Sequence, residues 1–452
     1  MLELATSGFW SPMADFVIYL VLPFILLLAF CITIHEFGHF LAAKLFHIPV
    51  EKFSIGFGPP LFRKKIGETD FRIAYFPLGG YVKMAGEEEG KILPTSEKNS
   101  KEPTEIKRSD QPGFYDAPIY KRIIVLTSGP LFNIISAIIV LIIIFSIFGL
   151  SIDPYTKIQI DENSYADRAG FINGDSIISV NDIRINNWDK FTEVLSNNID
   201  KEVNITVMRN GRKITKNLVI NLDSLGLTNL VPPILGTIKR GGPAYKAGMR
   251  TGDKVLKING AEVLAWNGLV DIIRYSKEKN FLFEWQHNGE IKTANITPIS
   301  VYDPITKDTV RQISVLIPRE RMYLSPSKIF VLSLNRTRDI IWLTLNTFYQ
   351  LIIGKISRKA LGGPIAIAKL SGESAQWGFE FLLGLLVIIS INLGLINLFP
   401  IPAIDGGHIV MSIIEAIRRK RFSKKTRIVI QQIGYALILL LIIFVTFNDI
   451  TR

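Results

Sequence analysis

The sequence is poor in the residues that several common protein classes need. It has one cysteine, Cys31, which excludes an intramolecular disulfide and leaves the redox compartment open. The formal net charge is +12, yet no basic stripe is interleaved with aromatic residues, so no nucleic-acid partner is expected. The first apolar stretch lacks a preceding basic segment and is too long for a cleavable signal peptide. The excess of positive charge therefore needs another explanation.

Long apolar stretches are what the sequence has instead. Hydrophobic residues make up 48% of the 452 residues and the mean hydropathy is +0.28, while 20% of the residues are charged. This mixture indicates a membrane protein with a soluble insert. Four segments are long and apolar enough to span a bilayer, at about 16–46, 123–150, 379–400 and 428–447.

The distribution of basic residues predicts the orientation of these spans. Residues 1–15 contain no Lys or Arg, whereas basic residues crowd the segment 418–427 before the last span. Because cytosolic loops carry the excess of Lys and Arg, residues 47–122 and 401–427 are expected in the cytosol and both termini outside. The insert 151–325 then lies outside as well.

A fifth apolar stretch, about 329–356, is interrupted by polar residues. We expect it to form an amphipathic helix on the outer membrane surface rather than a span. A fifth span would also reverse the segment 379–400 and place the basic loop outside, against the positive-inside rule.

The insert contains an internal repeat with an offset of 78 residues, in which Ala166–Asp175 aligns with Ala244–Asp253. The shared pattern A-x-x-A-G-x-x-x-G-D, followed by an apolar strand, resembles the PDZ domain. We therefore expect two extramembrane PDZ-like α+β domains, at about 151–222 and 223–300. Such domains bind peptides by strand addition; a role as rigid spacers that limit access has equal weight.

The pentapeptide His35-Glu36-Phe37-Gly38-His39 lies inside the first apolar stretch. On a helix, His35 and His39 project from one face and are positioned to bind one Zn²⁺, with Glu36 beside them as a candidate general base. Ionisable groups are costly at membrane depth, so they indicate function there. The alternative is a buried polar cluster that packs helices.

Catalytic zinc usually has three protein ligands, so a third ligand is needed. Asp405 is the preferred candidate, because it lies in a proline-broken segment, 397–408, at the same cytosolic depth as the histidines. A helix-capping role for Asp405 stays open, and His408 is a competing ligand. His47 is a poorer candidate for the third ligand, because it lies about 12 Å further along a helix than His39. His287 is also a poorer candidate, because it falls in the extramembrane repeat.

Together these motifs resemble the intramembrane site-2 protease family of zinc metalloproteases. The resemblance is carried by H-E-F-G-H in the first span and N-x-x-P-x-P-x-I-D-G-G at the third, and the tandem PDZ-like domains narrow it to the bacterial branch that regulates a sigma factor. Departures are small: Ile404 replaces the usual Leu, and Ser128 the usual Ala. Further matches are Ser128-Gly129-Pro130 with Asn133, Pro77–Met84, and Gly362-Gly363-Pro364.

The resemblance implies the roles of the site residues. One Zn²⁺ per chain would be held by His35, His39 and Asp405, and Glu36 would act as general base and then as general acid. Asn397 would hydrogen-bond the substrate backbone, although a role at the helix break is nearly as well supported.

A membrane-associated β-loop is also implied, at about 52–85, with a turn at Pro77–Gly80. By the resemblance, its residues Gly79, Gly80 and Tyr81 would hold the substrate by strand addition.

The resemblance further implies the substrate and the location. The expected substrates are single-span membrane proteins in the bacterial inner membrane, either anti-sigma factors already shortened on the periplasmic side or signal-peptide remnants. The PDZ-like domains would exclude substrates with bulky external domains. Two other functional classes fit the sequence less well. Glu36 argues against a non-catalytic PDZ membrane scaffold, and a single ionisable cluster argues against a zinc transporter.

The expected fold is thus an α-helical four-span core with a membrane-associated β-hairpin, two PDZ-like domains and an interfacial amphipathic helix. The expected divisions are 1–150 for the first half of the core, with a linker at 86–120, then 151–222, 223–300, a connector at 301–378 carrying the amphipathic helix, and 379–452 for the second half of the core.

Overall fold

The computed structural model describes residues 17–86, 113–220, 225–276, 278–303, 308–356 and 361–451. It divides into two compact units, one made of Met1–Ile147 with Ser325–Arg452 and the other of Phe148–Leu324. Most of the expected linker at 86–120 lies outside the described residues.

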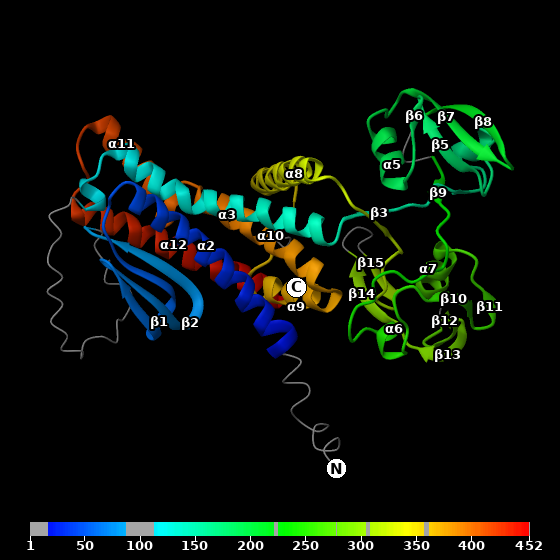
Figure 1. The fold of residues 1–452 in the computed structure, drawn as a ribbon, viewed down its shortest axis with the longest axis horizontal. Helices are drawn as coiled ribbons and strands as arrows, with labels where there is room; N and C mark the ends of the chain where they lie inside the picture. Colours follow the sequence, from blue (N-terminus) through cyan, green and yellow to red (C-terminus); the bar gives the residue numbers. More distant parts are fainter. Residues whose placement is uncertain are drawn as a thin grey trace, which may run out of the picture. The chain divides into compact units, whose positions relative to one another are not determined.

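The first unit contains the membrane core. Within the described residues, four helical segments are long and apolar enough to cross a bilayer, which confirms the four predicted spans. They are η1 with α2 (Val17–Val21 and Leu22–Leu45), α3 (Ile119–Ile147), α10 (Phe379–Asn397) and α12 (Lys424–Thr451). The helix α3 is central, since it packs against α2 and α10 and also against the helices α8 (Pro326–Ile352) and α11 (Asp405–Arg418) (Figure 1).

Small residues allow these helices to approach one another closely. A Cβ atom on Gly38 of α2 would lie 2.5 Å from the backbone oxygen of Ser128 in α3. A Cβ atom on Gly394 of α10 would lie 2.8 Å from the backbone oxygen of Pro130. Helices that associate in lipid depend on this close packing, because no hydrophobic effect drives them together there.

The β-loop forms a sheet of two long strands, β1 (Val50–Ile66) and β2 (Thr69–Met84). Phe53 in β1 pairs with both Phe71 and Val82, so the first half of β1 lies between two stretches of β2. The second stretch, Gly80–Met84, is reached through Gly79, whose φ of +141° suits glycine. The chain therefore changes direction at the predicted turn.

The segment expected to be amphipathic is the helix α8, which is not among the four candidate spans. It buries one face through Ile329, Ser333 and Thr337, spaced four residues apart, and it packs against α3 and α10. A further helix, α9 (Pro364–Trp377), was not predicted; it packs against α10 and η1.

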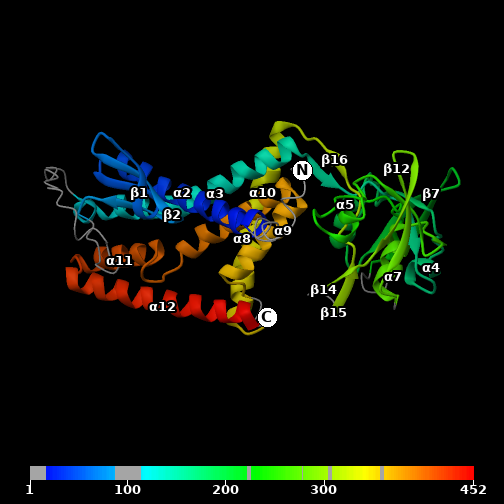
Figure 2. The same ribbon diagram turned by 90° about the horizontal axis from the view of Figure 1, so that it is seen from below.

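The second unit carries the repeat, and the structure confirms it. The first copy has α4 (Tyr165–Arg168), α5 (Trp188–Ser196) and a sheet of order β6-β5-β7-β8; the second has α6 (Pro243–Lys246), α7 (Trp266–Tyr275) and a sheet of order β11-β10-β12-β13 (Figures 1 and 2). Each copy has its own buried apolar cluster.

The strands of the first sheet are β5 (Ser176–Val180), β6 (Ile183–Arg184), β7 (Glu202–Arg209) and β8 (Arg212–Val219). Those of the second are β10 (Lys254–Ile258), β11 (Ala261–Glu262), β12 (Phe281–His287) and β13 (Glu290–Ile296).

Three two-stranded pairings complete this unit. They are β3 (Leu150–Ile152) with β16 (Glu320–Met322), β4 (Ile158–Ile160) with β9 (Leu227–Asn229), and β14 (Ile299–Asp303) with β15 (Asp308–Gln312).

One polar contact recurs in both copies of the repeat. Arg209 Nη2 lies 2.7 Å from the Asp175 carboxylate, and His287 Nδ1 lies 2.7 Å from Asp253 at the equivalent position. Burial alone would raise the pKa of Asp175, but the hydrogen-bonded Arg209 guanidinium outweighs burial and holds this pKa below its usual range. His287 is therefore engaged in a contact within its own repeat.

Candidate metal centre and catalytic site

The structure brings together the three residues that the sequence suggested as metal ligands. His35 and His39 are buried one turn apart on α2, and their Nε2 atoms are 3.1 Å apart. Asp405 is the first residue of α11, and its Oδ2 lies 3.0 Å from His35 Nε2 and 3.3 Å from His39 Nε2. One ligand atom from each residue therefore faces the same point.

This arrangement fits a zinc ion. In a tetrahedral site with bonds of about 2.0–2.1 Å, neighbouring ligand atoms are about 3.3 Å apart, close to the separations found here. Asp405 Oδ2 is buried and has no hydrogen-bond donor among the described residues, as expected of an oxygen that binds a cation. Two imidazole nitrogens and one carboxylate oxygen form a common set of zinc ligands.

The hydrogen bond at the other ring nitrogen of His39 also favours metal binding. Its Nδ1 lies 2.8 Å from the backbone oxygen of Val125 in α3. A carbonyl oxygen only accepts, so Nδ1 carries the proton and Nε2 keeps its lone pair for a metal.

Two residues of α3 complete the surroundings of the histidines. A Cβ atom on Gly129 would lie 2.3 Å from His39 Nε2 and 2.9 Å from His35 Cε1, so the site has room only for glycine there. The fully buried Asn133 has its Nδ2 3.4 Å from His35 Nδ1. Sequence reasoning noted the Ser128-Gly129-Pro130 motif with Asn133 but missed that it lies against the histidines.

The proline-containing turn before α11 brings Asp405 to the histidines. After α10 ends, Ala403 adopts a φ of +78°, and α11 begins at Asp405. A Cβ atom on Gly406 would lie 2.0 Å from the backbone oxygen of Phe399, and one on Gly407 would lie 2.3 Å from that of Ile401. The two glycines thus let the turn fold closely over the start of α11.

Glu36 lies between the metal ligands and the β-sheet. The backbone amide of Val82 lies near its carboxylate. A Cβ atom on Gly80 would lie 3.3 Å from Glu36 Cγ, so the second stretch of β2 runs past this side chain. The neighbouring Tyr81 ring stacks on Phe57, with ring centroids 6.3 Å apart, and Gly79 is buried at the preceding turn.

The remaining candidates lie at different distances from this centre. Asn397, the last residue of α10, has its Nδ2 3.4 Å from both ring nitrogens of His35. His408 has its Nε2 3.5 Å from Gln431 Nε2 and is not part of the three-residue group. His47 lies just beyond the end of α2 with a φ of +59°.

Comparisons with known proteins agree with this geometry. The chain matches the model of peptidase family M50 over residues 23–441. It is 30% identical over 456 residues to a Neisseria meningitidis protein named as a zinc metalloprotease, covering 96% of this chain and 99% of that protein. It is 31% identical over 456 residues to the regulator of sigma-E protease RseP of Escherichia coli, covering 95% of this chain and 98% of that protein. A solved PDZ domain from Listeria monocytogenes matches 19% of this chain and 84% of that domain at 18% identity, with a TM-score of 0.16, too low to establish the fold.

Proposed function

Because the chain belongs to peptidase family M50 and is a membrane zinc metalloendopeptidase of the site-2 protease class, we propose that His35, His39 and Asp405 hold one zinc ion per chain and that Glu36 is the general base. The observation that carries this proposal is the convergence of three ligand atoms within 4.8 Å of one another, with Glu36 on the next position of the same helix.

A zinc ion bound there would supply a Lewis acid that polarises the peptide carbonyl and lowers the pKa of water. The protein's own groups then orient the reactants and move the protons. Glu36 accepts the proton of the attacking water and returns it to the leaving amine nitrogen. Asn397, beside His35, is placed to hydrogen-bond the substrate backbone.

We propose that the stretch Gly80–Met84 of β2 presents the substrate. A helical substrate hides its peptide bonds in its own hydrogen bonds, so it must be extended before hydrolysis. An edge strand stabilises an extended chain by main-chain pairing. Gly79 gives this stretch its direction, Gly80 brings it against Glu36, and Tyr81 flanks it. Exposed apolar side chains elsewhere on the sheet support its contact with the bilayer: Phe57, Leu61, Phe62, Tyr75 and Phe76.

The proposed substrates are single-span membrane proteins of the bacterial inner membrane. The Escherichia coli relative is named as a regulator of sigma-E protease, which favours an anti-sigma factor already cleaved on the periplasmic side; signal-peptide remnants are a second class. The basic loop before α12 supports an orientation with both termini and residues 148–324 outside, the active site in the cytosolic half, and α8 at the outer surface. The two repeats, at about 151–222 and 223–300, then act as PDZ-like modules that exclude bulky substrates.

The test uses Glu36→Gln and Asp405→Ala in the purified full-length chain, reconstituted with a single-span substrate. Glu36→Gln is expected to abolish cleavage while retaining zinc, and Asp405→Ala to lose both. The exposed Glu373→Gln on α9 is the matched control. Normal cleavage by Glu36→Gln would disprove the proposed mechanism. Unchanged zinc content in Asp405→Ala would disprove the ligand assignment alone.

A further inference from the structure

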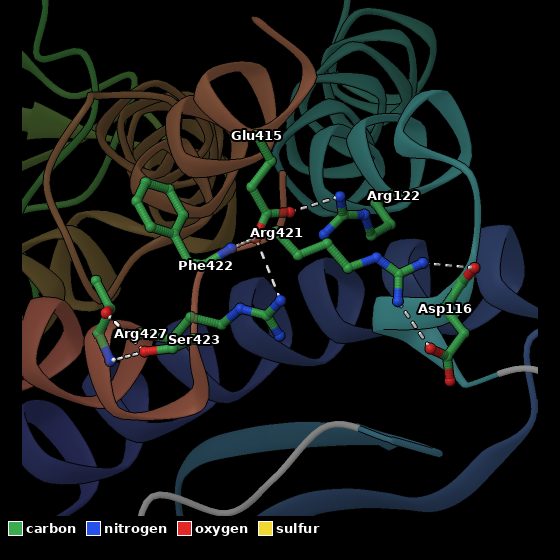
Figure 3. Close-up of polar contacts among 8 residues, drawn as sticks. Asp116, Arg122, Glu415, Arg421, Phe422, Ser423 and Arg427 are labelled. Carbon is green, nitrogen blue, oxygen red and sulfur yellow. Dashed lines mark hydrogen bonds and ion pairs between the residues drawn. The ribbon is translucent and has the colours of Figure 1, made fainter. Parts of the chain in front are cut away.

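A buried carboxylate near the end of α11 joins three separate parts of the membrane unit (Figure 3). Glu415 Oε2 accepts a hydrogen bond of 2.7 Å from Arg122 Nη2 in α3. Glu415 Oε1 accepts one of 2.8 Å from the Phe422 amide in the turn after α11 and one of 3.2 Å from Arg427 Nη2 in α12. One side chain thus fixes α11 to α3, to its own following turn and to α12.

The pair between Arg122 and Glu415 is almost completely removed from solvent, with side chains 2% and 4% exposed. Among the described residues, Arg122 Nε has no hydrogen-bond partner, so Glu415 provides the compensation for this buried charge. Burial alone would raise the pKa of Glu415, but the Phe422 amide and the two guanidinium groups outweigh it and lower this pKa. Separating the pair would leave an uncompensated charge, which makes the contact hard to break.

This contact bears on the metal centre through the helices that it joins. Asp405 begins α11 and Glu415 lies ten residues later, about 15 Å along a rigid helix. Arg122 is on α3, the helix whose Val125 oxygen holds His39 and whose Gly129 lies against both histidines. The same helix therefore holds both the histidine pair and the helix that carries the third ligand.

We propose that Arg122 and Glu415 are positioning residues that set the place of the Asp405 carboxylate relative to the two histidines. The inference rests on the proposed role of Asp405 as a zinc ligand. Neither residue touches the reacting atoms; they act by fixing α11 on α3. Ligand atoms at a metal must be held within fractions of an ångström, so a small shift of α11 weakens the metal site before it unfolds the protein.

A second ion pair close by provides a matched control. Arg421 Nη1 lies 2.9 Å from Asp116 Oδ1 and joins the turn after α11 to the residues just before α3 (Figure 3). Its side chains are 55% and 60% exposed. It links nearly the same two parts of the chain as Arg122 and Glu415. An exposed ion pair, however, contributes little to the stability of the fold.

The experiment measures the zinc dissociation constant of the purified full-length chain by chelator competition, alongside the thermal unfolding temperature. Glu415→Gln and the double variant Arg122→Met with Glu415→Met are compared with Asp405→Ala and with the control Asp116→Asn. Zinc binding by Glu415→Gln and by the double variant is expected to weaken about 10- to 100-fold, as for other groups that orient metal ligands. Raising the zinc concentration should recover part of their activity. Asp116→Asn should match the unmodified chain in both measurements.

The double variant removes both charges together and fills their space with apolar side chains, so it is expected to fold even if Glu415→Gln does not. A folded double variant with unchanged zinc affinity would overturn the inference. A lower unfolding temperature with unchanged zinc affinity would also overturn it, because the pair would then only support the fold. Unchanged zinc affinity in Asp405→Ala would instead show that the ligand assignment itself is wrong.

Discussion

Replacing Gly129 by alanine tests directly how α3 shapes the metal centre. The added Cβ atom would lie 2.3 Å from His39 Nε2, whereas ordinary contacts begin at 3.4 Å, so one group must move by about 1 Å. The His39 ring has little freedom to move, because its Nδ1 is held by the backbone oxygen of Val125, which lies on α3 with Gly129. A misplacement of about 1 Å at a catalytic centre reduces the rate about 100-fold. We therefore expect kcat/KM to fall by at least about 100-fold and zinc binding to weaken.

The assay compares zinc content, cleavage of a single-span substrate and thermal unfolding for Gly129→Ala and for Gly384→Ala. Gly384 is also a glycine within a membrane-spanning helix, α10, but a Cβ atom there would meet nothing within 4 Å. The control variant should keep full activity, since alanine is a better helix former than glycine. Normal zinc content and cleavage in Gly129→Ala would refute the described packing of α3 against the histidines.

Three further predictions follow from the same structure. A chelator should abolish cleavage, and added zinc should restore it in the unmodified chain but not in Glu36→Gln; restoration in that variant would contradict the role of Glu36. Asp449 accepts hydrogen bonds from two backbone amides at the start of α9, so Asp449→Ala should destabilise α9 by about 0.5–2 kcal/mol; unchanged hydrogen–deuterium exchange in α9 would argue against this capping. Arg209 lowers the pKa of Asp175, so their pair stabilises the first repeat above about pH 4 and this contribution is lost as the pH falls through the lowered pKa. Asp175→Asn should flatten the acid-induced rise in exchange of that repeat, and an unchanged pH profile would exclude this contribution.

The spans were predictable because a bilayer imposes a minimum apolar length on any helix that crosses it. Their ends were less accurate. The second span was expected from residue 123, but α3 begins at Ile119 and includes Arg122. Hydropathy treats this charge as a boundary signal, whereas the structure neutralises it with Glu415 from a helix almost 300 residues away. A local window cannot detect such a partner.

The helix α9 was missed for a related reason. Its start is stabilised by Asp449, whose carboxylate accepts from the amides of Gly363 and Ala366. A helix-capping residue is normally sought just before the first turn. Here the capping group comes from the far end of α12, so only the folded chain supplies it.

By itself, the sequence determined what depends on spacing along the chain. The four-residue spacing of His35 and His39 places both on one helix face, and the offset of 78 residues predicts two copies of one fold. Tertiary structure alone decided between Asp405 and His408 as neighbours of the histidines, and it brought the Val125 oxygen and Gly129 against them. These contacts join different helices, and the angles at which helices cross are set by packing rather than by any local pattern.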